Sequence, residues 1–164
     1  MQFDPDSEQI RDVYARYGLA MYQAQCVERS IAMLLSLMEA HPSDTTRATY
    51  TMLLDRLFAS TLGTLIRQIG ASAATDPELQ ARLKAALSKR NWLAHSYFWD
   101  RAGNFQTTRG RQKMIAELES LSAEFAALDS ELEPLYQDLG RRAGVREADA
   151  QKYLKELLAN AVGS

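Results

Sequence analysis

The chain has 164 residues, a length that fits a single domain. Apolar residues make up 46% and charged residues 24%, which is ordinary for a globular protein and excludes a disordered or collagen-like chain. Nineteen Lys and Arg against 21 Asp and Glu give a net charge of -2, which excludes a surface that is basic all over and argues against a non-specific DNA binder.

The N-terminus and the single cysteine give expectations about the compartment. Cys26 has no partner for an intramolecular disulfide and cannot build a zinc site made of cysteines. Residues Met1 to Asp6 lack the basic and apolar regions of a signal peptide. The longest nearly apolar run, Ile31 to Met38, is shorter than the roughly 20 residues that a membrane span needs. We therefore expect a soluble, cytoplasmic protein with no membrane partner.

The first half of the chain has the apolar spacing of two long helices. Asp4-Pro5 is typical of a helix N-cap followed by proline, and the spacing continues to His41-Pro42, where His41 is expected at the surface of a helix end. A second pattern covers about residues 45 to 69, and the stretch Ser60 to Gly63 is a point where a separate helix can begin.

The second half predicts a third helix from Asp76-Pro77 to about Tyr97 or Phe98, then a loop or short hairpin over residues 99 to 108. A fourth helix, about 109 to 139, has a heptad seam, which Pro134 should bend or break. The seam consists of Met114, Leu118, Leu121, Phe125, Leu128, Leu132, Leu135 and Leu139. A short helix over about 146 to 160 ends the chain.

These patterns predict one all-α domain over residues 1 to 164. The expected architecture is an up-and-down bundle of four to five helices with a short loop or hairpin insertion after the third long helix.

The third helix carries polar residues within its expected core stripe. That stripe consists of Leu79, Leu83, Ala86, Leu87, Ala94 and Tyr97. Arg90 falls in its middle and therefore needs an ion-pair partner or a solvated cleft, and we expect Glu28 of the first helix to lie near Arg90 or Asn91. Asn91 and His95 are four residues apart and share one face. Trp92 points almost the opposite way, which favours a second contact surface such as a dimer interface.

Most signatures of catalytic sites are missing. There is no glycine-rich phosphate loop, no G-x-S-x-G and no H-E-x-x-H, and two histidines in the whole chain argue against a histidine metal centre. The sequence therefore predicts neither a metal nor a cofactor.

The segment Arg90-Asn91-x-x-x-His95 resembles the signature of the HEPN superfamily, a group of small helical bundles found in bacterial toxins, anti-phage systems and CRISPR effectors. Tyr97 extends the match to Arg-x4-His-x-Tyr. This longer form is similar to toxins encoded beside a minimal nucleotidyltransferase antitoxin that modifies the tyrosine.

The resemblance implies a metal-independent endoribonuclease that works as a homodimer, with two copies of the motif facing each other. It makes Arg90, His95 and Asn91 the catalytic residues, because an imidazole can move the protons of 2′-OH attack and a guanidinium suits the scissile phosphate. On an ideal helix Arg90 and His95 are about 140° apart, and a site shared between two chains accommodates that separation. The 2′-OH requirement implies an RNA substrate. Tyr97 is the candidate for modification by a nucleotidyltransferase antitoxin.

A basic segment surrounds the motif. Residues 89 to 113 hold six cations against Asp100 alone, a net charge of +5, which leaves -7 for the rest of the chain. Besides Arg90, the cations are the RNA-binding candidates Lys89, Arg101, Arg109, Arg111 and Lys113. A solvated basic loop is an equally good interpretation. The alternative function is a catalytically silent interaction or nucleotide-binding module, in which Arg90, Asn91 and His95 bind an anion or brace the bundle.

Overall fold

Every regular element in the described part of the computed structural model is an α-helix. The structure describes residues 5–39, 52–53, 55–57, 59–71, 76–142, 144 and 159. The helices are α1 (Pro5–Glu39), α3 (Leu62–Ala71), α4 (Pro77–His95), α5 (Tyr97–Asp100), α6 (Ala102–Phe105) and α7 (Thr108–Arg142). The all-α helical bundle expected from the sequence is therefore confirmed, whereas the helix expected over 146 to 160 and the position of His41 lie outside the described residues.

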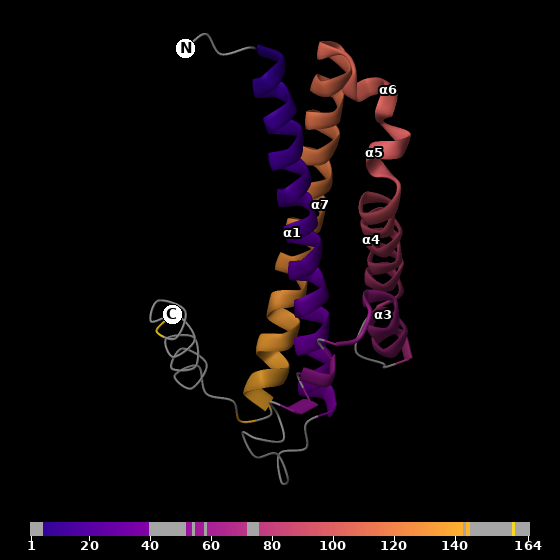
Figure 1. Ribbon diagram of the computed structural model, residues 1–164. Coiled ribbons are helices and arrows are strands. Elements are labelled where there is room, and N and C mark those ends of the chain that lie inside the picture. The colour runs from indigo at the N-terminus through magenta and orange to yellow at the C-terminus, as the bar shows by residue number, and fades with distance from the viewer. Residues whose placement is uncertain are drawn as a thin grey trace.

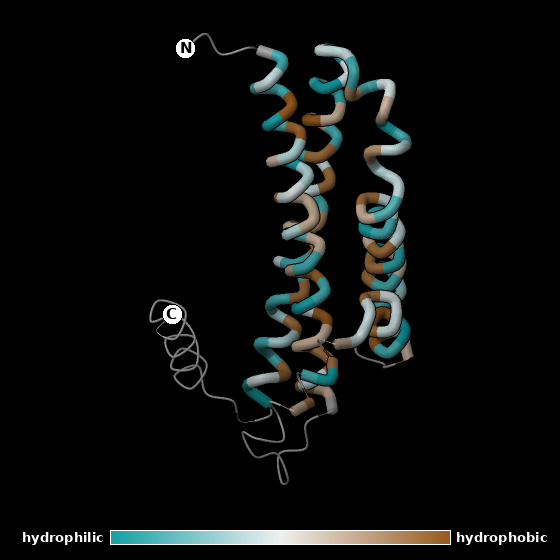
Figure 2. The backbone as a smooth tube through the Cα atoms, in the orientation of Figure 1, coloured by the Kyte–Doolittle hydropathy of each residue, from teal (hydrophilic) through white to brown (hydrophobic). Residues whose placement is uncertain are grey.

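The two longest helices, α1 and α7, lie side by side and run in the same direction (Figure 1). Arg16 Nε donates to Glu119 Oε1 at 2.8 Å, and further along both helices Ser30 Oγ donates to Asp129 Oδ1 at 2.5 Å. Because both partners advance along the chain together, the pair is parallel. Its interface is apolar, as Figure 2 illustrates by the recurring brown positions along both helices.

Helix α4 runs in the opposite direction to α7, with α3 beside it (Figure 1). Arg82 of α4 pairs with Glu131 of α7, and seven residues later Lys89 pairs with Glu124, seven residues earlier in α7. The equal steps of seven residues in opposite directions show that α4 and α7 are antiparallel and packed in a heptad register. The heptad seam of α7 is confirmed: its first six positions are buried and its last two are half-buried.

The helix ends follow the local sequence signals. The Asp76 side chain accepts a hydrogen bond from Leu79 N at 2.8 Å, which caps α4 as expected. A separate helix does begin in the predicted stretch, at Leu62. Of the bend or break expected at Pro134, the break does not occur, and α7 continues through this residue. The interruption is tolerated because Pro134 and Ser130, whose carbonyl loses its helical partner, both face solvent.

The predicted loop or hairpin over residues 99 to 108 consists instead of short helical turns. Helix α4 stops at His95, where the Tyr17 hydroxyl donates to the Leu93 carbonyl at 3.0 Å, and a new turn, α5, starts at Tyr97. Then α6 leads back to α7. Pieces of four residues are too short to show a helical period in the sequence.

Helix α6 packs against the first turn of α7 at a glycine. A Cβ placed on Gly110 would lie 2.0 Å from the carbonyl oxygen of Asn104, so only glycine allows this approach. The contact fixes the path of α5 and α6, and with it the end of α4 that carries the motif.

No helix within the described ranges combines the length and the apolar character needed to cross a bilayer. Polar residues, drawn in teal, recur along each helix in Figure 2.

Candidate functional site

The last two turns of α4 carry the predicted motif. Arg90 is half-buried, whereas Asn91 and His95 are exposed to solvent. Because α4 is helical throughout from Pro77 to His95, the five-residue step separates Arg90 and His95 by about 140° around the helix. The structure therefore gives one chain an arginine turned toward α1 and a histidine turned away from it.

The predicted proximity of Glu28 and Arg90 is confirmed. Arg90 Nη2 lies 3.8 Å from Glu28 Oε2, and the two side chains keep 30% and 22% of their surface exposed. Arg90 Nη1 also donates to Asn91 Oδ1 at 3.2 Å, while Arg90 Nε is buried without a hydrogen-bond partner. At 3.8 Å the Glu28 contact is an ion pair longer than a hydrogen bond, so the guanidinium has donors left for a further acceptor.

The face of α4 beside Arg90 is more open than the sequence predicts. Ala94, which was expected in the core, is exposed, and Leu93 is buried in its place. The reason is that α3 is short. It lies against α4 at Leu87, where a Cβ on Gly63 would be 3.6 Å from the leucine, and runs from there toward the start of α4. The turns that carry Arg90 and Ala94 thus extend past α3.

Tyr97, the candidate for modification, is a core residue. Only 1% of it is exposed, and its hydroxyl donates to the Met114 carbonyl at 3.3 Å. Burial, together with the Glu117 carboxylate, raises the pKa of Tyr97 far above its usual value of 10. This placement counts against Tyr97 as a target, because a modifying enzyme reaches the hydroxyl only if α5 separates from α7.

The basic segment is largely neutralised by carboxylates that lie outside it in the sequence. The pairs are Lys89–Glu124, Arg90–Glu28, Arg101–Glu117 and Arg111–Asp6. Counting charges along the sequence could not show this, because every partner lies outside residues 89 to 113. Lys89 and Arg101 are therefore less available to bind the phosphates of RNA.

Arg111 is a structural residue in this fold, which counts against the prediction that it binds RNA. Its side chain is 5% exposed and pairs with Asp6 at the start of α1. Nε donates to Gln9 Oε1 and Nη1 donates to the Phe105 carbonyl, both at 3.1 Å. The guanidinium thus joins α1, α6 and α7 and has no free face for a phosphate.

Arg109 and Lys113 differ from the other four cations. Both are exposed, and neither forms an ion pair with any described residue. They border a shallow depression where α6 meets α7, lined also by Gly103, Asn104, Thr107 and Gly110. Of the predicted RNA-binding residues, these two alone remain available to a polyanion within the described chain.

Trp92 does not form the outward contact surface predicted for it. Its Nε1 donates to Asp100 Oδ2 at 2.8 Å, its ring meets Tyr97 edge-on, and Arg101 lies 4.9 Å above the ring. The exposed tryptophan is Trp99, which sequence reasoning missed. The sequence does contain a signal for the exposure of Trp99. It lies two residues from Tyr97, and a helical turn places residues two apart on opposite sides.

Among the residues described, no three His, Cys, Asp or Glu side chains converge as metal ligands. Comparisons with models of protein families, with curated proteins and with solved structures find no match to this chain.

Proposed function

We propose that the protein is a metal-independent endoribonuclease of the HEPN type. The observation that carries the proposal is the state of Arg90: its guanidinium is half-buried, loosely paired with Glu28, and next to the exposed Asn91. A purely structural arginine forms short bonds on every side, as Arg111 does. The Nε of Arg90 is buried, but its Nη2 approaches Glu28 only to 3.8 Å and so keeps donors for an anion, and the helix also presents the exposed His95.

The residue types suit cleavage through the ribose 2′-OH. His95 takes the 2′ proton or protonates the departing 5′-oxygen, and Arg90 binds the scissile phosphate and the charge that develops on it. Asn91 positions the phosphate or the imidazole. The 2′-oxygen bonds to phosphorus as the bond from phosphorus to the 5′-oxygen breaks, which leaves a cyclic phosphate. Because Arg90 and His95 diverge on one helix, the site draws them from two chains of a homodimer.

The first test is cleavage itself. Purified protein should cut single-stranded RNA in EDTA, with cyclic or 3′-phosphate ends, and His95→Ala and Arg90→Ala should each abolish cutting while the far-UV circular dichroism spectrum is kept. His41→Ala and Lys84→Ala are the matched controls, and both should cut normally. If His95→Ala cut RNA as fast as the wild type, the activity would come from a contaminating nuclease and the proposal would be refuted.

A mixing experiment tests the shared site. Arg90→Ala and His95→Ala homodimers are inactive alone, but a mixed dimer keeps one site with Arg90 from one chain and His95 from the other. Mixing the two variants should therefore restore part of the activity. No restoration, or a monomer at micromolar concentration in sedimentation, rules out the shared site.

The resemblance also points to a toxin acting on RNA in the cytoplasm, of a toxin–antitoxin or anti-phage system. Expression should then arrest growth, and Arg90→Ala should relieve the arrest. If a nucleotidyltransferase antitoxin modifies Tyr97, mass spectrometry after co-expression should show an added nucleotide on that residue. Because the hydroxyl is buried, we expect modification mainly before the chain has folded.

The second candidate is a catalytically silent interaction or nucleotide-binding module. The neutralised basic segment favours it, since four of its six cations already have carboxylate partners. In that case Arg90 and Asn91 bind a nucleotide or another anion without cleavage. Binding of a nucleotide that Arg90→Ala weakens, with no RNA cut by the wild type, would favour this module.

A further inference from the structure

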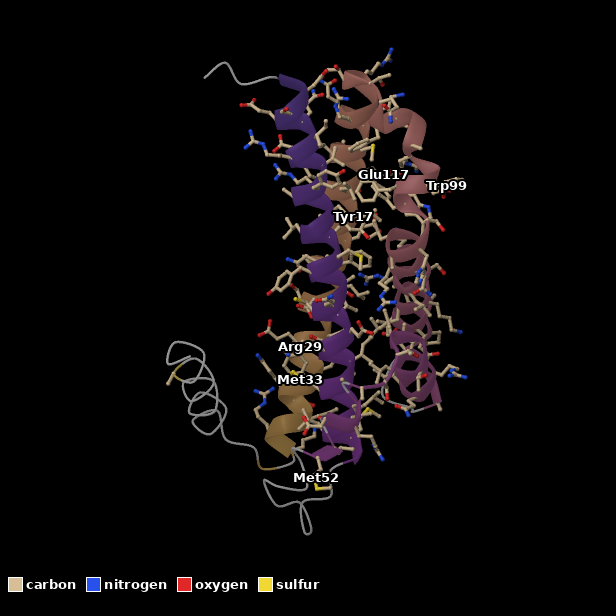
Figure 3. All side chains as sticks on the ribbon, in the orientation of Figure 1. Tyr17, Arg29, Met33, Met52, Trp99 and Glu117 are labelled. Carbon is tan, nitrogen blue, oxygen red and sulfur yellow. The ribbon has the colours of Figure 1, made fainter. Side chains whose placement is uncertain are left out.

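Trp99 is the most exposed of the large apolar residues in the described chain. It keeps 86% of its surface, against 72% for Met52, the next highest. Figure 3 shows it at the outer edge of α5, whereas Tyr17 projects from α1 into the bundle. The neighbouring Tyr97 and Phe98 meet edge-on, and both rings contact the Tyr17 ring of α1. The inward side of α5 therefore holds the turn in place, and Trp99 contributes nothing to the core.

Trp99 lies close to the motif along the backbone. It follows His95 by four residues, across Ser96, where α4 ends and α5 begins. The join is tight, because Ser96 N bonds to the Trp92 carbonyl and Asp100 N to the Ser96 carbonyl, both at 2.9 Å. Even fully extended, four residues span at most about 14 Å, so Trp99 lies beside the end of α4 that carries the motif.

The two exposed cations without an ion-pair partner in the described chain, Arg109 and Lys113, follow Trp99 in the sequence. Four residues after Trp99, Gly103 borders the depression that Arg109 and Lys113 also line. Proteins bind single-stranded nucleic acid with exposed aromatic rings and cations, because bases stack on the rings and phosphates meet the cations. A protein partner would need a wider apolar patch, but the residues next to Trp99 in the chain that are also exposed are Asp100, Ala102 and Gly103.

We propose that Trp99 is a base-stacking residue for single-stranded RNA, adjacent to the cleavage motif, with Arg109 and Lys113 binding the phosphates beyond it. The proposal rests on the proposed function for its choice of RNA. It makes Trp99 a binding residue that sets affinity and the position of the strand, without a part in proton transfer.

The test separates binding from cleavage by using the His95→Ala background. The affinity of a fluorescein-labelled single-stranded RNA of mixed sequence is measured by polarisation, with and without Trp99→Ala. Stacking on one aromatic side chain predicts a Kd raised about 5- to 140-fold. Trp99→Phe, which keeps a ring, should restore most of the affinity, and RNA should quench the tryptophan fluorescence of His95→Ala far more than that of His95→Ala/Trp99→Phe.

Three outcomes would overturn the proposal. One is an unchanged Kd in Trp99→Ala, and the second is the absence of any RNA binding. The third is a dimer that Trp99→Ala converts to a monomer in sedimentation without RNA, which would assign Trp99 to an interface between copies. Failure of the nuclease is distinguishable, because wild-type protein that binds RNA through Trp99 but never cuts it refutes cleavage alone. Normal cutting and affinity in Trp99→Ala refute the stacking role alone.

Discussion

Replacing Gly110 with alanine tests how closely α6 packs on the first turn of α7. The new methyl group would lie 2.0 Å from the Asn104 carbonyl oxygen and 2.6 Å from its carbonyl carbon. An ordinary contact begins at 3.4 Å, so the α6 backbone must move by about 1.4 Å. The atoms that have to move are backbone, and the adjoining Phe105 carbonyl also accepts from Arg111.

The expected cost follows from two opposing effects. Overpacking costs about 1 to 3 kcal/mol, and we expect the upper end because no flexible side chain can yield. Alanine regains about 1 kcal/mol of helix propensity over glycine. The net loss is about 2 kcal/mol, which for a chain of this size lowers the Tm by roughly 4 to 8 °C.

Gly18→Ala is the matched control. Gly18 lies inside α1, is exposed, and has no atom within 4 Å of where a Cβ would be. Here the propensity gain acts alone, so the free energy of unfolding should rise by about 0.5 to 1 kcal/mol. Urea unfolding followed by circular dichroism measures both variants. If Gly110→Ala stabilised the protein as Gly18→Ala does, the close packing of α6 on α7 would be refuted.

Three further changes test other parts of the bundle. Burial holds the pKa of Tyr97 above its usual value of 10, so above pH 10 the unfolded chain ionises at this residue before the folded chain does. The free energy of unfolding should therefore not depend on Tyr97 below pH 10 and should fall above it by up to about 1.4 kcal/mol per pH unit. Tyr97→Phe should flatten that fall in urea unfolding at rising pH, and an unchanged slope would argue that the ring is not buried. Arg111→Met should cost about 2 to 4 kcal/mol in the same assay, since Asp6 and the Phe105 carbonyl lose their shared partner; a neutral result would mean that the network adds no stability. Arg82→Ala should cost less than about 1 kcal/mol, with a loss that shrinks in salt, because its ion pair is exposed; a larger, salt-independent loss would contradict a surface pair.

The long helices could be predicted because their signals are local. The Asp76 cap and the seam from Met114 to Leu132 depend on residues within a turn or two of each other, and both are present in the structure. Glu28 was also found in advance, because a cation in an apolar stripe needs a partner on a neighbouring helix.

The predictions that were wrong concern residues whose surroundings are set by segments far away in the sequence. Ala94 is exposed because α3 lies against α4 only from Leu87 toward its start, and no pattern within α4 contains that length. Arg111 became a structural residue through Asp6, about one hundred residues earlier in the chain. The candidate site was thus predicted correctly at the level of its helix and its ion pair. Which cations remain free for a ligand could be known only from the fold.

The parallel pairing of α1 and α7 has a consequence for how the protein is made. Arg16 and Glu119 are 103 residues apart in sequence, and Ser30 and Asp129 are 99 apart. At a synthesis rate of about 5 to 20 residues per second, α1 leaves the ribosome roughly 5 to 20 s before its main partner exists. During that time the stripe that includes Val13, Val27 and Ile31 lacks α7, and only the shorter helices α3 and α4 emerge to pack against α1. We expect folding to follow translation and the nascent α1 to be a substrate for chaperones.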